Sequence, residues 1–273
     1  MITNREYFHI KEEKSMDDKI AETLPYGVAL SWGLGKQPQR GPKRELSLQQ
    51  IVDAAIAIAD KDGLAAVSMS KVAASLGFTP MSLYRYVPSK DDLLLLMQDA
   101  ACDITIPPIR DGASWRENIR EYVQTTIKVF RDHPWFGDIP IFGAPITPNH
   151  LKIVDWILRG VRELSLNDYE KMSIILLVSS YARAWGILQR DMEQAIQAGA
   201  TASTFSGQDY SEALKQLVTA ERFPDLYPLI MSGTYTGENI EETNDDDDFD
   251  FGLERILDGI EHYLELKKKH NNI

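Results

Sequence analysis

Residues 47–93 contain four helix-start signals, set so close together that the helices between them must be short. Each signal is a hydroxyl side chain that can accept a hydrogen bond from a backbone N–H two or three residues later. Glycine or proline follows the first three helical stretches, and both residues end helices. This part of the chain is therefore predicted to fold as a group of short crossing helices. The start signals are Ser47, Ser68, Thr79 and Ser89.

Three of these helices have the layout of a helix-turn-helix. We expect them to begin at Ser47, Ser68 and Thr79, with Pro80 at the first helical position of the third, where a missing N–H costs nothing. Gly77, between the second and third helices, is free to adopt the left-handed conformation that ends a helix. Small residues such as Ala73 let two helices cross closely. The predicted arrangement is three short helices with a glycine turn before the last.

The third helix carries the groups that can read DNA. Leu83 and Val87 fall on its inner face, so the other face is left for a ligand. That face offers an arginine fork, a hydroxyl and an aromatic ring, which suit base edges and phosphates in a major groove. Nearby cations before and after the helices suit phosphate contacts. The outward residues are Pro80, Met81, Ser82, Arg85 and Tyr86, and the nearby cations are Lys43, Arg44 and Lys90.

The charge is divided along the chain in a way that fits this interpretation. The net charge of −12 is at first sight unfavourable for nucleic-acid binding. Residues 36–90, however, contain eight basic and four acidic residues, whereas residues 91–273 have a net charge of −14. Such a division is typical of a small nucleic-acid-binding part joined to a larger acidic domain. On charge alone, chance clustering explains the pattern equally well.

The chain beyond Thr105 shows helical periodicity interrupted by proline or glycine, and no alternating strand pattern of useful length. The sequence therefore predicts an all-α protein with a three-helix DNA-binding domain followed by a larger helical domain. The predicted parts are a flexible extension with a basic arm at 1–45, the helix-turn-helix at 46–92 and the larger domain at 93–273. The later helices are expected at Trp115–Arg131, Asn149–Leu164, Asp168–Gln197, Ser211–Arg222 and Phe251–Lys269.

The main alternative to a DNA-binding protein is an enzyme, but the sequence offers no pattern of catalytic or metal-binding residues. No pair among the five histidines has metal-ligand spacing, and the single cysteine, Cys102, cannot form a disulfide within the chain. The acidic run Asp245–Asp248 resembles a calcium loop only by composition, because phenylalanines occupy ligand positions. We therefore expect no catalytic residue, metal or cofactor. A single cysteine indicates a reducing compartment, the cytoplasm. The sequence contains no uninterrupted apolar run of about 18 residues, so no membrane span is predicted.

The helix-turn-helix part of the sequence resembles the DNA-binding domain of the tetracycline-repressor (TetR) family. The resemblance covers roughly residues 46–100, and residues 249–261 also resemble the last helix of the family's ligand domain. The family signature Leu-Tyr-x-(His/Tyr)-(Val/Phe)-x-x-Lys-x-x-Leu is present. Its positions are Leu83, Tyr84, Tyr86, Val87, Lys90 and Leu93.

The resemblance implies a homodimer that binds a double-stranded DNA operator, usually as a repressor. For two of the implied contacts another role is open: Ser68 is also a helix cap, and Tyr84 is equally suited to helix packing. Arg85 stands where tetracycline repressor has tryptophan, so the docking mode transfers but the operator sequence does not. The implied contacts are Ser68, Ser70, Pro80, Met81, Ser82, Tyr84, Arg85, Tyr86 and Lys90.

The resemblance also implies a small hydrophobic effector bound between the middle helices of the large domain. Aromatic residues at helical spacing suit such a pocket, although spacing alone favours a plain core. A second hypothesis remains open, in which the large domain binds a protein partner and no small molecule. The candidate effector residues are Trp115, Tyr122, Thr126, Phe130, Trp156, Tyr181 and Trp185.

The last helix carries an apolar stripe that must be buried. The family uses this helix and the long one before it to build a four-helix dimer interface, and dimerisation places two recognition helices on a palindrome. The alternative is that the stripe packs on its own domain. The residues of the stripe, which we expect at the dimer interface, are Leu253, Ile256, Leu257, Ile260 and Leu264.

Overall fold

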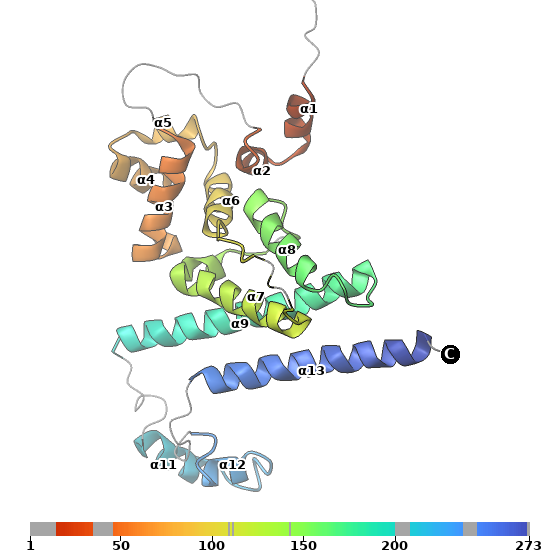
Figure 1. Ribbon diagram of the computed structural model, residues 1–273. Coiled ribbons are helices and arrows are strands. Elements are labelled where there is room, and N and C mark those ends of the chain that lie inside the picture. Colours follow the sequence, from red (N-terminus) through yellow and green to blue (C-terminus); the bar gives the residue numbers. More distant parts are fainter. Residues whose placement is uncertain are drawn as a thin grey trace, which may run out of the picture. The chain divides into compact units, whose positions relative to one another are not determined.

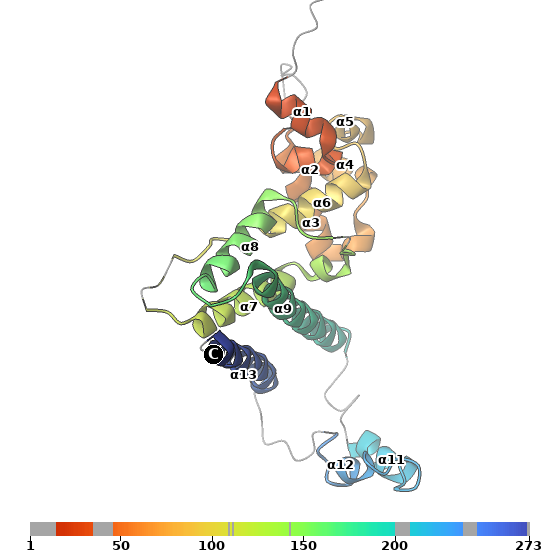
Figure 2. The same ribbon diagram turned by 90° about the vertical axis from the view of Figure 1, so that its right-hand side faces the viewer.

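Helices form the regular secondary structure throughout the part of the chain that the computed structural model describes, which confirms the predicted fold class (Figures 1 and 2). Contacts divide the chain into two compact units. The first unit comprises 1–108 and 138–156, and the second comprises 109–137 and 157–273. The described residues are 15–34, 46–108, 110, 112–141, 143–199, 208–236 and 245–271.

The predicted helix-turn-helix is present in the first unit. The Ser47 hydroxyl accepts a hydrogen bond from the Gln50 N–H in a complete capping box, and the Ser89 hydroxyl accepts one from the Asp92 N–H. Gly77 has a φ of 74°, as the turn between the second and third helices requires. The third helix ends at Tyr84, earlier than predicted. The helices are α3 (Leu48–Asp62), α4 (Met69–Leu76), α5 (Pro80–Tyr84) and α6 (Lys90–Ala101), with a 3₁₀ turn, η1 (Leu64–Ala66).

One apolar core holds these four helices together. Its largest members are fully or almost fully buried, and they come from α3, α4, α5, α6 and the segment that follows α5. Burying such side chains removes apolar surface from water, which is the main favourable term in folding. The core thereby fixes which face of the short helix α5 points outward. The core residues include Ile51, Val72, Leu83, Val87, Leu93 and Met97.

The prediction of a flexible extension over residues 1–45 is wrong for its described middle part. Two helices form there, α1 (Met16–Thr23) and α2 (Tyr26–Ser31), and α2 packs on α6. The Gly27 N–H donates to Asp92 Oδ1 at 2.8 Å, and the Trp32 indole N–H donates to the Ile146 carbonyl at 2.9 Å. Burial of Val28, Ala29 and Leu30 against the first unit explains why so short a segment is ordered.

The predicted boundary at residues 92 and 93 falls inside α6, which continues through Ala101. After it, Cys102 is buried, and this burial raises the pKa of its thiol, as does the nearby Asp99. The Asp99 carboxylate accepts a hydrogen bond from the Asn149 backbone N–H at 2.9 Å. Asn149 lies at the start of α8 (Pro148–Gly160), so Asp99 holds the beginning of α8 to α6.

The second unit is built on α7 (Trp115–Asp132), α9 (Asp168–Gln197) and α13 (Asp245–Asn271), with the 3₁₀ turn η2 (Pro134–Asp138) after α7. Figure 1 shows α9 and α13 running side by side. Helices α7 and α9 approach closely at Gly186, where a Cβ atom would lie 2.8 Å from the Cβ of Phe130. Arg116 of α7 forms ion pairs at 2.7 Å with Glu254 and Asp258 of α13.

Two shorter helices lie in sequence between α9 and α13. They are α11 (Gln208–Leu217), which ends earlier than predicted, and α12 (Tyr227–Met231), which was not predicted. The two contact each other, and Ile230 is fully buried. The acidic run at 245–248 lies at the start of α13, which begins at Asp245.

Candidate nucleic-acid interface

Helix α5 has an exposed outer face and is anchored by one buried residue of its own and by another just after it. Leu83 and Val87 are completely buried, as predicted for the inner face. Met81 is 73 % exposed and Tyr84 is 44 % exposed. Between residues 46 and 108 these are the two exposed large apolar side chains, and both belong to α5. The helix therefore has an outer face with unusual apolar character for a surface.

The polar groups of the same face are available to a ligand. Arg85 and Lys90 are exposed, and in the described part of the chain no carboxylate forms an ion pair with either. The hydroxyls of Thr79 and Ser82 lie 3.0 Å apart, so the expected cap by Thr79 is replaced by a contact between the two side chains. Arg85 thus directly follows α5 and Lys90 begins α6, so two exposed cations follow the helix closely in sequence, and the hydroxyl pair lies at its start.

The remaining predicted DNA contacts differ in their availability. Ser68 is exposed, and its hydroxyl accepts a hydrogen bond from the Lys71 N–H at 3.1 Å, so it is the cap of α4. Ser70 is exposed, whereas Pro80 and Tyr86 are half-buried. Lys43 and Arg44 lie outside the described residues.

A neighbouring cation is partly neutralised within the chain itself. Lys71 Nζ lies 2.6 Å from Asp62 Oδ2, and this hydrogen bond holds the pKa of the Asp62 carboxyl below its usual value. An exposed pair of this kind contributes little to stability. Arg85 and Lys90 form no such pair among the described residues, so their charges are not neutralised in this way.

Five of the seven predicted effector residues form two groups on different sides of α9 within the second unit. In the first group, the Tyr122 hydroxyl lies 2.7 Å from Ser179 Oγ, and the Thr126 hydroxyl donates to the Tyr122 carbonyl. Phe130 is buried against Phe136, with ring centroids 5.4 Å apart. Tyr122 and Phe130 therefore line the contact between α7 and α9, and Thr126 is bonded within α7. Ser179, which sequence reasoning missed, supplies the polar partner.

The second group faces α13. The Tyr181 hydroxyl donates to the Phe249 carbonyl at 2.7 Å, and Trp185 packs 5.6 Å from the Phe249 ring. Trp115 is half-buried beside the Arg116 guanidinium, and Trp156 is a buried residue of the first unit. The seven predicted residues thus do not form one cluster.

The predicted dimer residues of α13 are mostly inside their own domain. Leu253, Leu257, Ile260 and Leu264 are buried within the chain, and only Ile256 is partly exposed. This corrects their assignment as a surface for a second copy. The stripe packs on its own domain because α13 lies along α9 and is held to α7 by ion pairs.

An exposed apolar stripe that sequence reasoning missed runs along α9 instead. Every fourth residue from 172 to 196 is exposed, and five of the seven are apolar and large. The fourfold spacing was a visible signal, because residues four apart lie on one helix face. The stripe consists of Met172, Leu176, Ser180, Ala184, Leu188, Met192 and Ile196.

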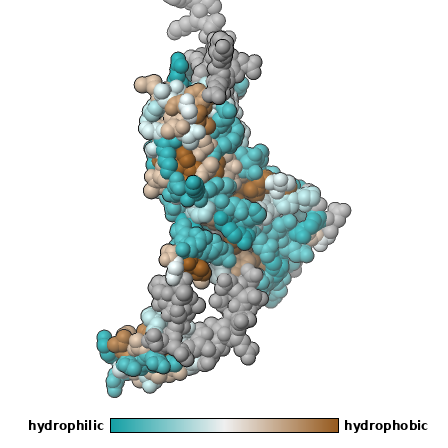
Figure 3. Space-filling view, turned by 90° about the vertical axis from the view of Figure 1, so that its left-hand side faces the viewer, coloured by the Kyte–Doolittle hydropathy of each residue, from teal (hydrophilic) through white to brown (hydrophobic). Residues whose placement is uncertain are grey.

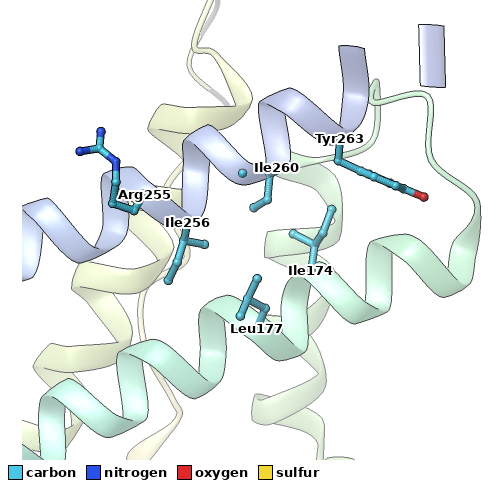
Figure 4. Close-up of a pocket in the computed structure, with 7 residues that line it drawn as sticks. Ile174, Leu177, Arg255, Ile256, Ile260 and Tyr263 are labelled. Atoms are coloured by element: carbon cyan, nitrogen blue, oxygen red, sulfur yellow. The ribbon is translucent and has the colours of Figure 1, made fainter. Parts of the chain in front are cut away.

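A shallow open pocket of about 290 Å³ lies between α9 and α13 (Figure 4). Leu177 comes from α9, whereas Ile256 and Tyr263 come from α13. Gly259 lies at the same surface, where an added Cβ would meet no atom within 4 Å. On the face drawn in Figure 3, by contrast, hydrophilic residues cover most of the described surface, and apolar residues form small separate groups.

Two general properties of the described residues bear on function. No group of three His, Cys, Asp or Glu side chains among them could hold a metal ion. Helix α9 is long and apolar enough to cross a membrane by length and composition, and 22 % of its most apolar window is buried.

Comparisons with known proteins agree with this geometry. The family "Bacterial regulatory proteins, tetR family" matches residues 51–97, and the family "Tetracyclin repressor-like, C-terminal domain" matches residues 107–264. The chain is 35 % identical over 256 residues to the HTH-type transcriptional repressor DrrR1 of Streptomyces coeruleorubidus, covering 91 % of this chain and 88 % of that protein.

Solved structures are similar over most of the chain. Apo ActR from Streptomyces coelicolor matches with a TM-score of 0.62 and 27 % identity, covering 79 % of this chain and 97 % of ActR. ActR in complex with actinorhodin matches with a TM-score of 0.64 and 28 % identity, covering 81 % of this chain and 96 % of ActR. The chain therefore belongs to the tetracycline-repressor (TetR) family, whose members are helix-turn-helix regulators of transcription and not enzymes.

Proposed function

We propose that this protein is a cytoplasmic homodimeric repressor that binds a palindromic operator and releases it when a small hydrophobic effector binds. The observation that carries the proposal is the outer face of α5, which combines Met81, Tyr84 and Arg85 on a helix anchored by a buried leucine. A short helix with this face fits a major groove, where side chains reach base edges and phosphates.

Symmetry follows from how such a helix is used. One five-residue helix contacts few bases, so specificity requires a second copy. In helix-turn-helix dimers the two recognition helices enter successive major grooves about 34–36 Å apart, and the operator is palindromic for that reason. We therefore assign the operator two half-sites related by the twofold axis of the dimer.

The exposed stripe on α9 is the surface that we assign to the second copy. Its side chains repeat every four residues, and ridges of this spacing pack into the grooves of another helix. Leu176 is 69 % exposed and Ile196 is 65 % exposed, which is unfavourable unless a partner covers them. Two copies of α9 and α13 would make a four-helix bundle.

The pocket between α9 and α13 supports the same interface. It is apolar and open, so a side chain of a second copy can fill it. Gly259 within a helix is unfavourable by about 1 kcal/mol relative to alanine, and its open side lets another backbone approach. This arrangement also explains the overall apolar composition of α9, because both of its sides are then covered by protein.

We assign the effector site to the second unit, at the polar and aromatic groups between α7 and α9. ActR has been crystallised in complex with actinorhodin and with (S)-DNPA, and this similarity supports a small-molecule effector here. Tyr122, Ser179 and Phe130 combine two hydroxyls with an aromatic ring, as sites for amphipathic ligands do. Release follows if the effector favours the conformation that binds the operator less well.

The test begins with the full-length protein and a random pool of duplex DNA. Repeated selection at low salt should enrich an inverted repeat, and footprinting on the protein's own promoter should protect the same sequence. A panel of aromatic and polycyclic compounds should then raise the thermal stability of the protein and weaken its binding to that duplex. A monomer that enriches no duplex would overturn the proposal. Stabilisation by no compound in a broad panel would favour a protein partner for the second unit.

A further inference from the structure

We infer that Met81 reads the C5-methyl group of a thymine in each operator half-site and is thereby a specificity-determining residue. The inference rests on the proposed function, because it takes α5 as the element that enters the major groove. Met81 is 73 % exposed, more than any other large apolar side chain between residues 46 and 108. Among the described residues, Leu83 and the following Val87 form the buried side of this segment, so Met81 lies on its exposed side.

The chemistry of the side chain restricts what it can contact in a groove. A thioether is only a weak hydrogen-bond acceptor and has no donor. It therefore cannot bind a phosphate, and it cannot replace the water bound to the amino or carbonyl group of a base. Burying a polar base edge under it would leave that edge without a partner, which is unfavourable. The thymine methyl is the apolar group that the major groove presents. Contact with that methyl is therefore the pairing that Met81 favours.

The position of Met81 supports contact with a base rather than with the sugar-phosphate backbone. In helix-turn-helix complexes the N-terminal residues of the recognition helix contact base edges. Met81 is the second residue of α5, directly after Pro80, and belongs to that first turn. Its flexible, unbranched side chain can adjust to the methyl group without moving the helix.

Arg85 extends the inference to a second base. It follows Met81 by four residues, and its backbone is still helical, with φ −72° and ψ −23°. Four residues of helix span about 6 Å, and base pairs are stacked about 3.4 Å apart. An arginine fork prefers guanine. Each half-site is therefore expected to contain a thymine and a guanine separated by about two base pairs.

The experiment removes single methyl groups from the DNA. A duplex selected from a random pool by the full-length protein is prepared with deoxyuridine in place of each thymine in turn, which deletes the methyl and keeps the base pair. We expect one thymine per half-site to matter, with binding about fourfold weaker for one half-site and about fifteenfold weaker for both. The Met81→Ala variant should bind thymine and deoxyuridine duplexes equally, and Met81→Leu should restore the difference.

Several results would overturn the inference. One is that no deoxyuridine replacement changes the affinity, and another is that Met81→Ala retains the full preference for thymine. Both results would leave the proposed repressor function intact, because the protein would still bind its selected duplex. Failure to enrich any duplex would instead contradict the proposed function, and with it this inference. Since Met81 is exposed, circular dichroism should show that both variants fold as the unchanged protein does.

Discussion

Arg85, directly after α5, is the exposed cation whose removal best separates base reading from general attraction to DNA. Arg85→Ala should weaken specific operator binding by about 1–3 kcal/mol if the guanidinium contacts a base. The measurement is a titration of the selected duplex at fixed salt. Arg131→Ala is the matched control, because Arg131 is an exposed arginine of α7 and its loss changes the net charge equally. Equal effects of the two substitutions would contradict a base contact.

The Glu170 carboxyl makes the stability of the fold depend on pH, because its pKa differs between the folded and unfolded protein. Its carboxylate accepts hydrogen bonds from Lys267, Tyr263 and the Asn167 backbone N–H, and these hold its pKa at about 2. An unfolded glutamate has a pKa of about 4.3. Since the folded pKa is the lower one, the stabilisation is complete above the unfolded pKa and is lost as the pH falls towards 2.

This sign gives a direct prediction. The melting temperature of the unchanged protein should fall between pH 6 and pH 3, and Glu170→Gln should lower it at pH 6 while making the fall smaller. The exposed Glu163→Gln substitution is the control and should leave the slope unchanged. Parallel curves for Glu170→Gln and the unchanged protein would show that the interaction does not contribute.

At the scale of single elements, those helices whose signals are local could be predicted from sequence. The caps at Ser47, Ser68 and Ser89 are contacts within four residues, so the chain needs no tertiary context to begin α3, α4 and α6 there. The same holds for α9, where a capping box begins at Asn167. These elements place α5, whose buried Leu83 and exposed Met81 agree with the prediction, although the helix ends earlier and lacks the expected Thr79 cap.

Elements defined by packing could not be predicted in the same way. Helix α2 has six residues and is stabilised by burial on α6, which is far from it in sequence. The stripe that includes Leu257 showed that α13 buries one face, but not which surface covers that face. Likewise, the helical spacing of Tyr181 is the same whether it lines an effector pocket or packs in the core. Only the fold shows that it packs on Phe249.

The packing of α2 on α6 gives a prediction for stability. A Cβ at Gly27 would lie 2.8 Å from Asp92 Oδ1 and 3.1 Å from Asp92 Cα, so Gly27→Ala forces backbone to move. We expect a loss of about 1–3 kcal/mol in the free energy of unfolding, measured by urea denaturation. Gly143→Ala is the control, since its new methyl meets no atom within 4 Å. Similar values for both would show that α2 does not pack as described.

At the scale of the whole molecule, the assembly depends on the stripe along α9. Leu176→Glu places a charge in the proposed interface, and burial of an unpaired charge is strongly unfavourable. The variant should therefore sediment as a monomer at concentrations where the unchanged protein is a dimer. It should also lose operator affinity, because the two recognition helices are no longer joined.

The control for this prediction is chosen by exposure. Ile141 is 68 % exposed and Leu176 is 69 % exposed, but Ile141 belongs to the first unit. Ile141→Glu should remain dimeric and bind the operator normally. A dimeric Leu176→Glu variant would exclude α9 as the interface and leave the oligomeric state to be explained by another surface.

The burial of Cys102 directly after α6 has a practical consequence. It is the single sulfhydryl of the sequence, and its burial keeps it protonated and unreactive. Alkylating reagents can therefore modify the native protein only when the end of α6 opens. The rate of modification, followed by mass spectrometry with and without duplex or compound, reports how often this opening occurs and requires no introduced label.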